Sequence, residues 1–420
     1  MVRLDFTPPV CPRKTRTAIW GLPDAYDFIN QHWNQRPSRG SHRSLSAAQL
    51  WRVHLLALLT PTHSFNQLIA LLPEQRAWRE FARLSPRHRG PDVRMLNEFR
   101  ARAGVTGFRA INDQLRLPLI ERPQVGPLRW HSSTRRICPR RAAASKKETR
   151  RYTAHRAALG GRTLKTGQSR CFVGYKKHTF RLWWREYTPA VILVPLVSGA
   201  APANVSEGGF LVPSLRYCQR RWSWWPQIVV ADRGYLAAEA KATGRRNWRV
   251  AVVTKLKTNM NLVSPYVAWN RTECPQGQPL RWLEYAPRED RHWFGVGGEP
   301  HFCQRCWEAS ACEREFAFAP SEHETLFGLL PLASLPAQRL LQQVRPWIEP
   351  TQSYEKTQLG LSQVFFNSLR LTWCMTLLAD AAVLLRSHVL LHAPAQQPDH
   401  LLRDLAPQQG FLDLGLNMAS

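Results

Sequence analysis

The sequence is short of acidic residues, since 30 Asp and Glu face 58 Lys and Arg, and the formal net charge is +28. Most soluble proteins are closer to neutral than this chain. So large a deficit of acidic residues predicts a polyanionic partner, most simply nucleic acid. An anionic membrane surface or a ribosomal role would also fit the charge alone. The excess is uneven, because residues 128–187 hold 17 Lys and Arg against two Glu.

An export signal and a clear membrane span are also lacking. Residues 1–19 have no apolar core, so we expect no secretory signal. The most hydrophobic stretch, Leu371–Leu391, carries Asp380 and Arg386, and it continues a helical pattern. We therefore expect a buried core helix from about Thr351 to His392 rather than a membrane span. Nine Cys without an export signal indicate reduced thiols or a metal site, not disulfides.

What is present predicts several domains, because 420 residues with 44% hydrophobic content can bury a sizeable core. Residues 1–125 have helical periodicity with interleaved Arg, which fits a solvated helical bundle and a DNA-end-binding domain equally well. The other expected segments are an α/β core over 126–260, a β-rich insertion over 261–343, a returning core helix over 344–395, and a tail over 396–420.

The core pattern is an alternation of strands and helices. We expect strands near 170–183, 189–197, 227–232 and 249–254, with helices near 210–220 and 235–243. This order is typical of an α/β sheet.

Asp232 ends an apolar run and begins the segment Asp232-Arg-Gly-Tyr. Functional groups collect where strands of α/β sheets end, and a carboxylate there can bind a hard divalent ion. Gly234 would permit the turn. On its own the segment also fits an ordinary Asp-x-Gly turn.

A second element lies 117 residues further on, where Arg345, Glu349 and Lys356 have the spacing R-x3-E-x6-K. On a helix these three residues fall on roughly one side. That would place one metal ligand between two phosphate-binding cations. Ordinary i,i+4 ion pairing on a solvated helix is the alternative.

Together, the Asp232 segment, the insertion and the Arg345/Glu349/Lys356 spacing resemble the DDE insertion-sequence transposases with a tyrosine-arginine-glutamate-lysine signature. The resemblance covers about residues 40–395. It implies a ribonuclease H-like core that holds Mg²⁺ or Mn²⁺ with Asp, Asp and Glu, and that cleaves and transfers DNA strands.

By this resemblance Asp232 and Glu349 are metal ligands, and Arg345 and Lys356 contact DNA phosphates. The implied partners are double-stranded DNA, as terminal repeats and target, and a second copy of the chain. A bacterial, cytoplasmic, nucleoid-associated protein without membrane contact is expected.

Two positions depart from the pattern. Gln342 stands where the family has tyrosine, and Pro350 follows Glu349, which would place Glu349 at a helix start. Glu355 is therefore a rival ligand. Lys176 and Lys177, on the second expected strand, could line the DNA groove or protect a strand edge.

The first Asp of the family is missing. No acidic residue occurs between Glu121 and Glu148, and residues 128–147 show neither strand nor helix periodicity. Suitable synonymous codons read from the third base of the Arg129 codon spell Val-Ala-Leu-Ile-Asp, an apolar strand ending in Asp. We therefore hypothesise a frameshift entered before Arg129 and corrected at or after Lys146-Lys147. A sequencing error, slippage on an adenine run and a genuine basic linker are the alternatives. Loss of this Asp would impair catalysis and remove the first strand, while DNA binding could survive.

Four cysteines of the expected insertion could form a structural zinc site, namely Cys274, Cys303, Cys306 and Cys312. Buried free thiols are the alternative.

Overall fold

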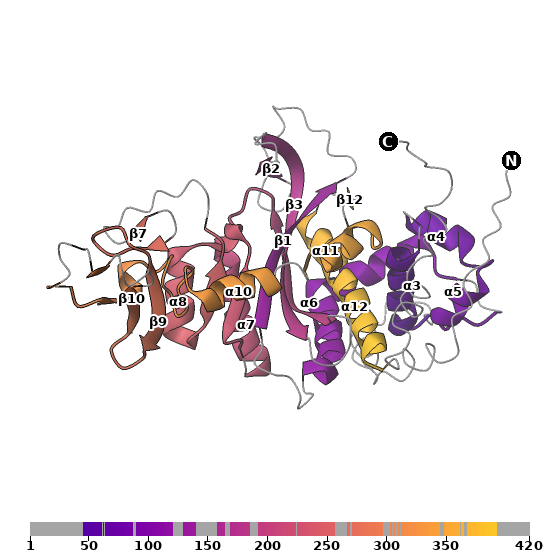
Figure 1. The fold of residues 1–420 in the computed structure, drawn as a ribbon. Coiled ribbons are helices and arrows are strands. Elements are labelled where there is room, and N and C mark those ends of the chain that lie inside the picture. The colour runs from indigo at the N-terminus through magenta and orange to yellow at the C-terminus, as the bar shows by residue number, and fades with distance from the viewer. Residues whose placement is uncertain are drawn as a thin grey trace, which may run out of the picture.

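The structure is a computed structural model that describes residues 45–120, 129–139, 158–163, 169–184, 192–256, 267–268, 271–296 and 303–392, apart from short gaps within some of these ranges. The described part is elongated, with a central sheet between a helical end and a small β-rich end (Figure 1).

The central sheet joins strands that are far apart in sequence. Its spatial order is β4 (Ile192–Pro202), β3 (Ser169–Trp184), β1 (Arg129–Pro139), β5 (Ile228–Ala231) and β6 (Ala251–Thr254). β1, β5 and β6 run parallel, whereas β3 is antiparallel to both β1 and β4. β2 (Ala158–Thr163) also pairs with β3, and the short β12 (Gln363–Val364) pairs with β1. The expected α/β class is confirmed at this level.

The central position of β1 corrects one expectation. The sequence of residues 128–147 predicts no strand, and the frameshift hypothesis implied that the first strand is absent. The structure places a strand over Arg129–Pro139, paired with β3 on one side and β5 on the other. The physical reason is that a ladder is made by backbone groups, and the facing edges of β3 and β5 need partners whatever side chains lie between them.

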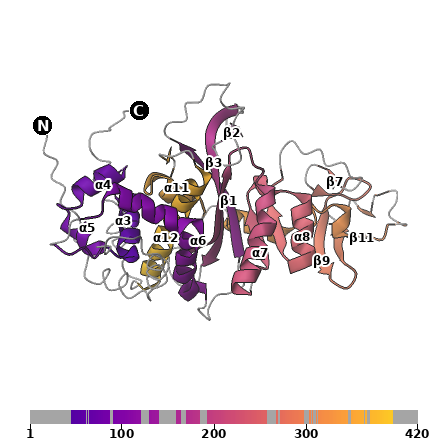
Figure 2. The ribbon, with the colours of Figure 1, turned by 180° about the vertical axis from the view of Figure 1, so that it is seen from behind.

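Helices cover both faces of the sheet. α7 (Leu211–Trp222) and α8 (Ala238–Trp248) lie on one face, seen from behind in Figure 2. α10 (Leu335–Gln343) and α11 (Ile348–Thr357) lie on the other face (Figure 1). The β5 residues alternate accordingly, because Val229 shares a cluster with α7, and Val230 shares one with α10 and α11. We call the second of these the α11 face.

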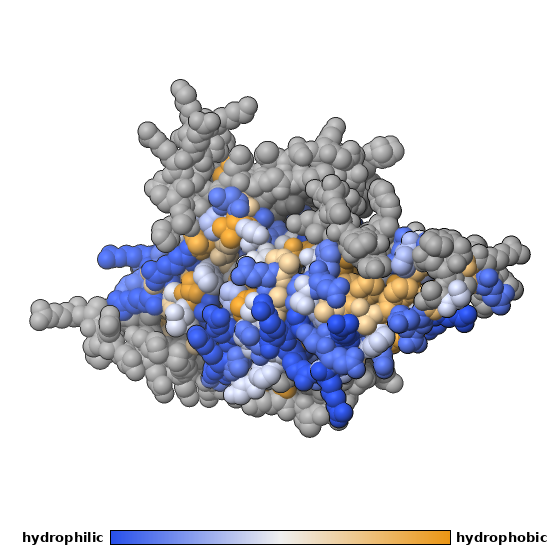
Figure 3. Space-filling model, turned by 90° about the vertical axis from the view of Figure 1, so that its left-hand side faces the viewer, coloured by the Kyte–Doolittle hydropathy of each residue, from blue (hydrophilic) through white to orange (hydrophobic). Residues whose placement is uncertain are grey.

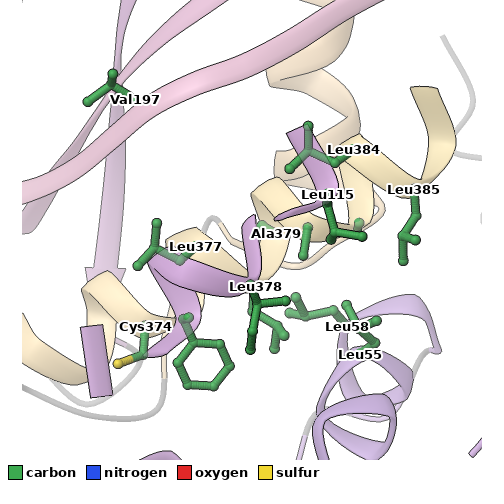
Figure 4. Packing of buried hydrophobic residues seen from close by; sticks show 14 of the residues in the cluster. Leu55, Leu58, Leu115, Val197, Cys374, Leu377, Leu378, Ala379, Leu384 and Leu385 are labelled. Carbon is green, nitrogen blue, oxygen red and sulfur yellow. The ribbon is translucent and has the colours of Figure 1, made fainter. Parts of the chain in front are cut away.

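The N-terminal helices form the other end of the molecule. They are α3 (Ala47–Leu59), α4 (Phe65–Leu71), α5 (Arg76–Phe81) and α6 (Val93–Ile120). α3 begins at a capping box in which Ser46 and Gln49 bond reciprocally to each other's backbone. α6, which is kinked at Gly104, packs along α12 (Leu369–His392), so one apolar core joins α3, α6 and α12 to the sheet (Figure 4).

The C-terminal helix differs from the expectation of one helix over 351–392. It is divided into α11 and α12, because Gly360 has φ 61° and the chain turns there before β12. Among the described residues, no helix is long and apolar enough to span a membrane. α12 is largely buried, as expected, and its Asp380 lies fully inside the protein.

The expected insertion contains a small sheet of β9 (Leu280–Ala286), β10 (Arg291–Val296) and β11 (Glu315–Phe318), with a separate hairpin of β7 (Val267–Ala268) and β8 (Arg271–Thr272). Arg245 of α8 bonds Asp290 and Glu324 and so ties this sheet to the core. Hydrophilic residues cover much of this end (Figure 3). α10, expected within the insertion, instead packs on the central sheet.

Candidate functional site

Asp232 lies directly after β5, as the sequence predicts. Its backbone is still extended (φ −69°, ψ 159°), and the short 3-10 turn η3 (Arg233–Tyr235) follows. Asp232 is half-buried at the end where parallel β5 and β6 finish, while neighbouring β1 continues to Pro139. A carboxylate is thus presented at the carboxyl edge of the sheet, where ligands of open α/β sheets bind.

The turn after Asp232 is anchored from β3. The hydroxyl of buried Tyr235 lies 2.9 Å from Nδ1 of His178. The ring of His178 stacks on Phe210, with 4.8 Å between centroids. Burial lowers the pKa of His178 to about 4, so this ring is neutral at physiological pH. The Tyr235 contact therefore fixes the turn without adding charge beside Asp232.

Glu207 also supports this turn, and sequence reasoning missed it. A Cβ added to Gly234 would lie 1.5 Å from Oε2 of Glu207, so a larger residue there would require the Glu207 side chain to move. The other carboxylate oxygen of Glu207 lies 3.2 Å from Nζ of Lys176. Half-buried Lys176, expected in a DNA groove, is therefore engaged in an ion pair. The fit of Gly234 around Glu207 depends on tertiary packing, which no local pattern reveals.

Glu349 lies in the first turn of α11 and is exposed, and Pro350 occupies the third helical position. This confirms the prediction that Glu349 stands at a helix start. Lys356 is exposed near the other end of α11, seven residues on, and so lies on the same side about 10 Å along the axis. Arg345 lies outside the described residues.

The first turn of α11 packs near the Asp232 segment. Ile348, directly before Glu349, belongs to one buried cluster with Val230 and Leu236, which flank Asp232 in sequence. The two predicted ligands therefore come from segments that share a hydrophobic anchor.

Glu355 has a different setting from Glu349. It is fully buried, and its Oε1 accepts from Nζ of Lys177 at 3.1 Å and from the guanidinium of Arg181. Lys177 also donates to Asp380 of α12 at 2.6 Å. These four residues, which we call the buried ion cluster, join β3, α11 and α12. They also correct the expectation for Lys177, which is buried and cannot line a groove.

The length of α11 explains why its two Glu residues differ. Ile348 is anchored beside β5 and Glu355 bonds β3, and β1 lies between those strands. Seven helical residues cover about 10.5 Å, and two strand spacings are about 9.6 Å. α11 is therefore long enough to reach from the cluster that contains Ile348 and Val230 to β3, which Glu355 bonds. Of the two Glu residues, Glu349 is the one that adjoins this cluster.

β1 contributes no carboxylate to this edge. Ala231 pairs in register with Ser132, so Asp232 is level with position 133, which itself pairs with Thr179 of β3. The strand from Arg129 to Pro139 contains no Asp or Glu.

No metal site is assembled among the described residues, since no three His, Cys, Asp or Glu side chains come together. Cys274, Cys303, Cys306 and Cys312 are described and carry free thiols, so the expected four-thiolate zinc site is not formed here. Cys303 and Cys306 lie in one turn, in which the Cys306 N–H donates to the Cys303 carbonyl. The spacing of the cysteines alone did not reveal whether the fold brings them together.

Comparison with known proteins adds little. No family profile and no curated protein matches the chain. Among solved structures, one similar chain is the piggyBac transposase in a synaptic complex with hairpin DNA, solved by cryo-EM. The identity is 10% and the TM-score 0.42, over 94% of this chain and 79% of the other. A likeness this distant supports no argument, so any functional conclusion has to rest on the geometry of the site itself.

Proposed function

We propose that the protein is a transposase of the DDE type with a ribonuclease H-like core, and that this chain lacks the first of its three carboxylates. The observation that carries the proposal is Asp232 at the carboxyl edge of the sheet, on the face crossed by α11. The sheet order supports it, because a central first strand lies between one antiparallel neighbour and two parallel strands, as in the ribonuclease H-like fold that the sequence resembles.

In this proposal Asp232 and Glu349 would hold Mg²⁺, which prefers oxygen ligands and keeps water and substrate phosphates in its shell. Two bound ions would activate the attacking oxygen and stabilise the leaving one. The donor set of this chain is one carboxylate short, because the strand beside β5 offers none. We therefore derive no catalytic step from the chain as it stands.

Position 133 is where the missing carboxylate belongs. It is level with Asp232 across the parallel β1–β5 pair, at a strand spacing of about 4.8 Å. The alternative reading that suitable synonymous codons permit, Val-Ala-Leu-Ile-Asp, begins at the third base of the Arg129 codon. Its Asp is encoded across the codons of Ser133 and Thr134. The frameshift hypothesis and the strand register therefore point to the same place.

The charges along β1 also fit a displaced reading frame. Arg135 pairs in register with buried Lys177. Like charges at directly opposite positions of a sheet are destabilising. The alternative reading would replace the basic residues of β1 by largely apolar ones.

The test compares the chain with Ser133→Asp, using a plasmid that carries the element with its ends. We expect cleavage dependent on Mg²⁺ to rise by orders of magnitude in the Ser133→Asp protein, and Asp232→Asn in that background to abolish cleavage while DNA binding persists. Cleavage that survives Asp232→Asn would remove Asp232 from the site. Independently, the coding DNA for residues 120–160 must encode the Asp-containing strand in the other frame, or the frameshift hypothesis is wrong.

A second candidate function is a non-catalytic DNA-binding remnant of an insertion element. The absence of any acidic residue on β1 favours it for this chain. It predicts salt-sensitive DNA binding and no cleavage, even after Ser133→Asp. Dimerisation on DNA remains a prediction under either candidate.

A further inference from the structure

The row of residues that contains Asp232 continues onto β6. Ala231 and Thr254 form the last pair of the parallel β5–β6 ladder, and Asp232 and Lys255 directly follow that pair on the two chains. Neighbouring strands lie about 4.8 Å apart where they pair. Lys255 therefore leaves the sheet at the same edge as Asp232, on the side of β5 opposite to β1.

Lys255 also belongs to the α11 face. Val230 and Val253, two residues before Asp232 and Lys255, are buried together with residues of α10 and α11. Side chains two residues apart in a strand share a face, so the row over Asp232 and Lys255 lies on the face that carries Glu349. Sequence reasoning gave Lys255 no role.

The side chain of Lys255 is exposed and has no hydrogen-bond or ion-pair partner among the described residues. This distinguishes it from Lys176, Lys177 and Lys241, each of which donates to an oxygen of the protein. An ammonium group with three free donors beside a carboxylate that would bind Mg²⁺ matches the needs of a phosphodiester oxygen.

We propose that Lys255 binds a DNA backbone phosphate next to Asp232. This inference rests on the proposed function, because it takes DNA to be the polyanion at this edge. It adds a contact that the Arg345/Glu349/Lys356 spacing does not include.

The experiment measures binding of the full chain to a duplex oligonucleotide by fluorescence anisotropy between 50 and 300 mM KCl. Loss of one phosphate contact lowers the slope of log affinity against log salt by about 0.9. If the affinities converge near 1 M salt, Lys255→Gln should bind roughly eightfold more weakly at 0.1 M. Lys255→Arg should keep the parent slope.

Arg288→Gln is the matched control, because it removes one exposed positive charge from the β9–β10 turn of the insertion. Its slope should equal that of the parent. If Lys255→Gln has the same slope as Arg288→Gln while all proteins bind DNA, the role of Lys255 is refuted and the proposed function stands. If the parent shows no salt-dependent DNA binding, the proposed function fails and this inference with it.

Discussion

Removing the charge of Glu355 should cost far more stability than removing that of Glu349. In Glu355→Gln the buried guanidinium of Arg181 loses its carboxylate partner, and Lys177 keeps only Asp380. The buried ion cluster then holds two cations and one anion, all nearly inaccessible to water. Nε and Nη1 of Arg181 already have no hydrogen-bond partner among the described residues.

The magnitude follows from this lost balance. Breaking a buried ion pair by removing one partner typically costs about 3–5 kcal/mol, because a charge stays buried without compensation. We expect Glu355→Gln to lose free energy of unfolding in this range. Exposed Glu349→Gln should change it by less than about 0.5 kcal/mol.

Urea unfolding followed by tryptophan fluorescence measures the effect, as a shift of the midpoint at unchanged slope. The double variant Arg181→Met/Glu355→Gln removes one charge of each sign and leaves the pair Lys177–Asp380 intact. The double variant should recover much of the lost free energy of unfolding. A buried charge without its partner costs more stability than removal of both partners of the pair.

The result that refutes this reasoning is a Glu355→Gln midpoint equal to that of Glu349→Gln. The carboxylate of Glu355 would then be free of the ion pairs, and Glu355 would return as a rival metal ligand. A double variant less stable than Glu355→Gln would refute the charge-balance explanation in particular.

Two further predictions concern the core. Burial lowers the pKa values of His54 and His178 to about 4, so the unfolded chain binds more protons between about pH 4 and 6.5. Stability should therefore fall as pH is lowered from 6.5 to 4. His178→Gln should flatten that fall in urea midpoints, and an unchanged pH profile would contradict it. Gly234→Ala should lower the melting temperature and weaken Mn²⁺ binding at Asp232 in the Ser133→Asp background, because its Cβ would overlap Glu207. Glu207→Ala should relieve this loss, and a Gly234→Ala protein as stable as the parent would refute the packing argument.

Periodicity predicted β3, β4, β5 and β6 but not β1, β2 or β12. The strands around Val229 and Val252 were recognised because they are short, apolar and bounded by polar turns. The position of Asp232 directly after β5 was predicted for the same reason, since a carboxylate ending such a run has a definite place in an α/β sheet. The division of the last helix at Gly360 was missed, because the apolar pattern continues through the turn.

The residues around the site were harder to predict. Lys177 and Glu355 are 178 positions apart, and no local signal shows that they share a buried ion pair. Lys176 and Lys177 are neighbours of the same type, yet Lys176 is half-buried and Lys177 is inaccessible, because successive strand residues face opposite sides. The expected four-thiolate zinc site could not be judged from the sequence for a related reason. The spacing between cysteines does not show which path the chain takes between them.

In β1, the position of the strand in the sheet and the chemistry of its side chains have different origins. Its place follows from the backbone edges of β3 and β5, so a strand forms between them even with Arg135 level with Lys177. Its chemistry depends on each side chain, and a shift of one base changes all of them. Ser133→Asp restores one acidic residue beside Asp232 but leaves Arg135 opposite buried Lys177. A protein carrying the complete alternative reading should therefore be more stable than Ser133→Asp, as well as active.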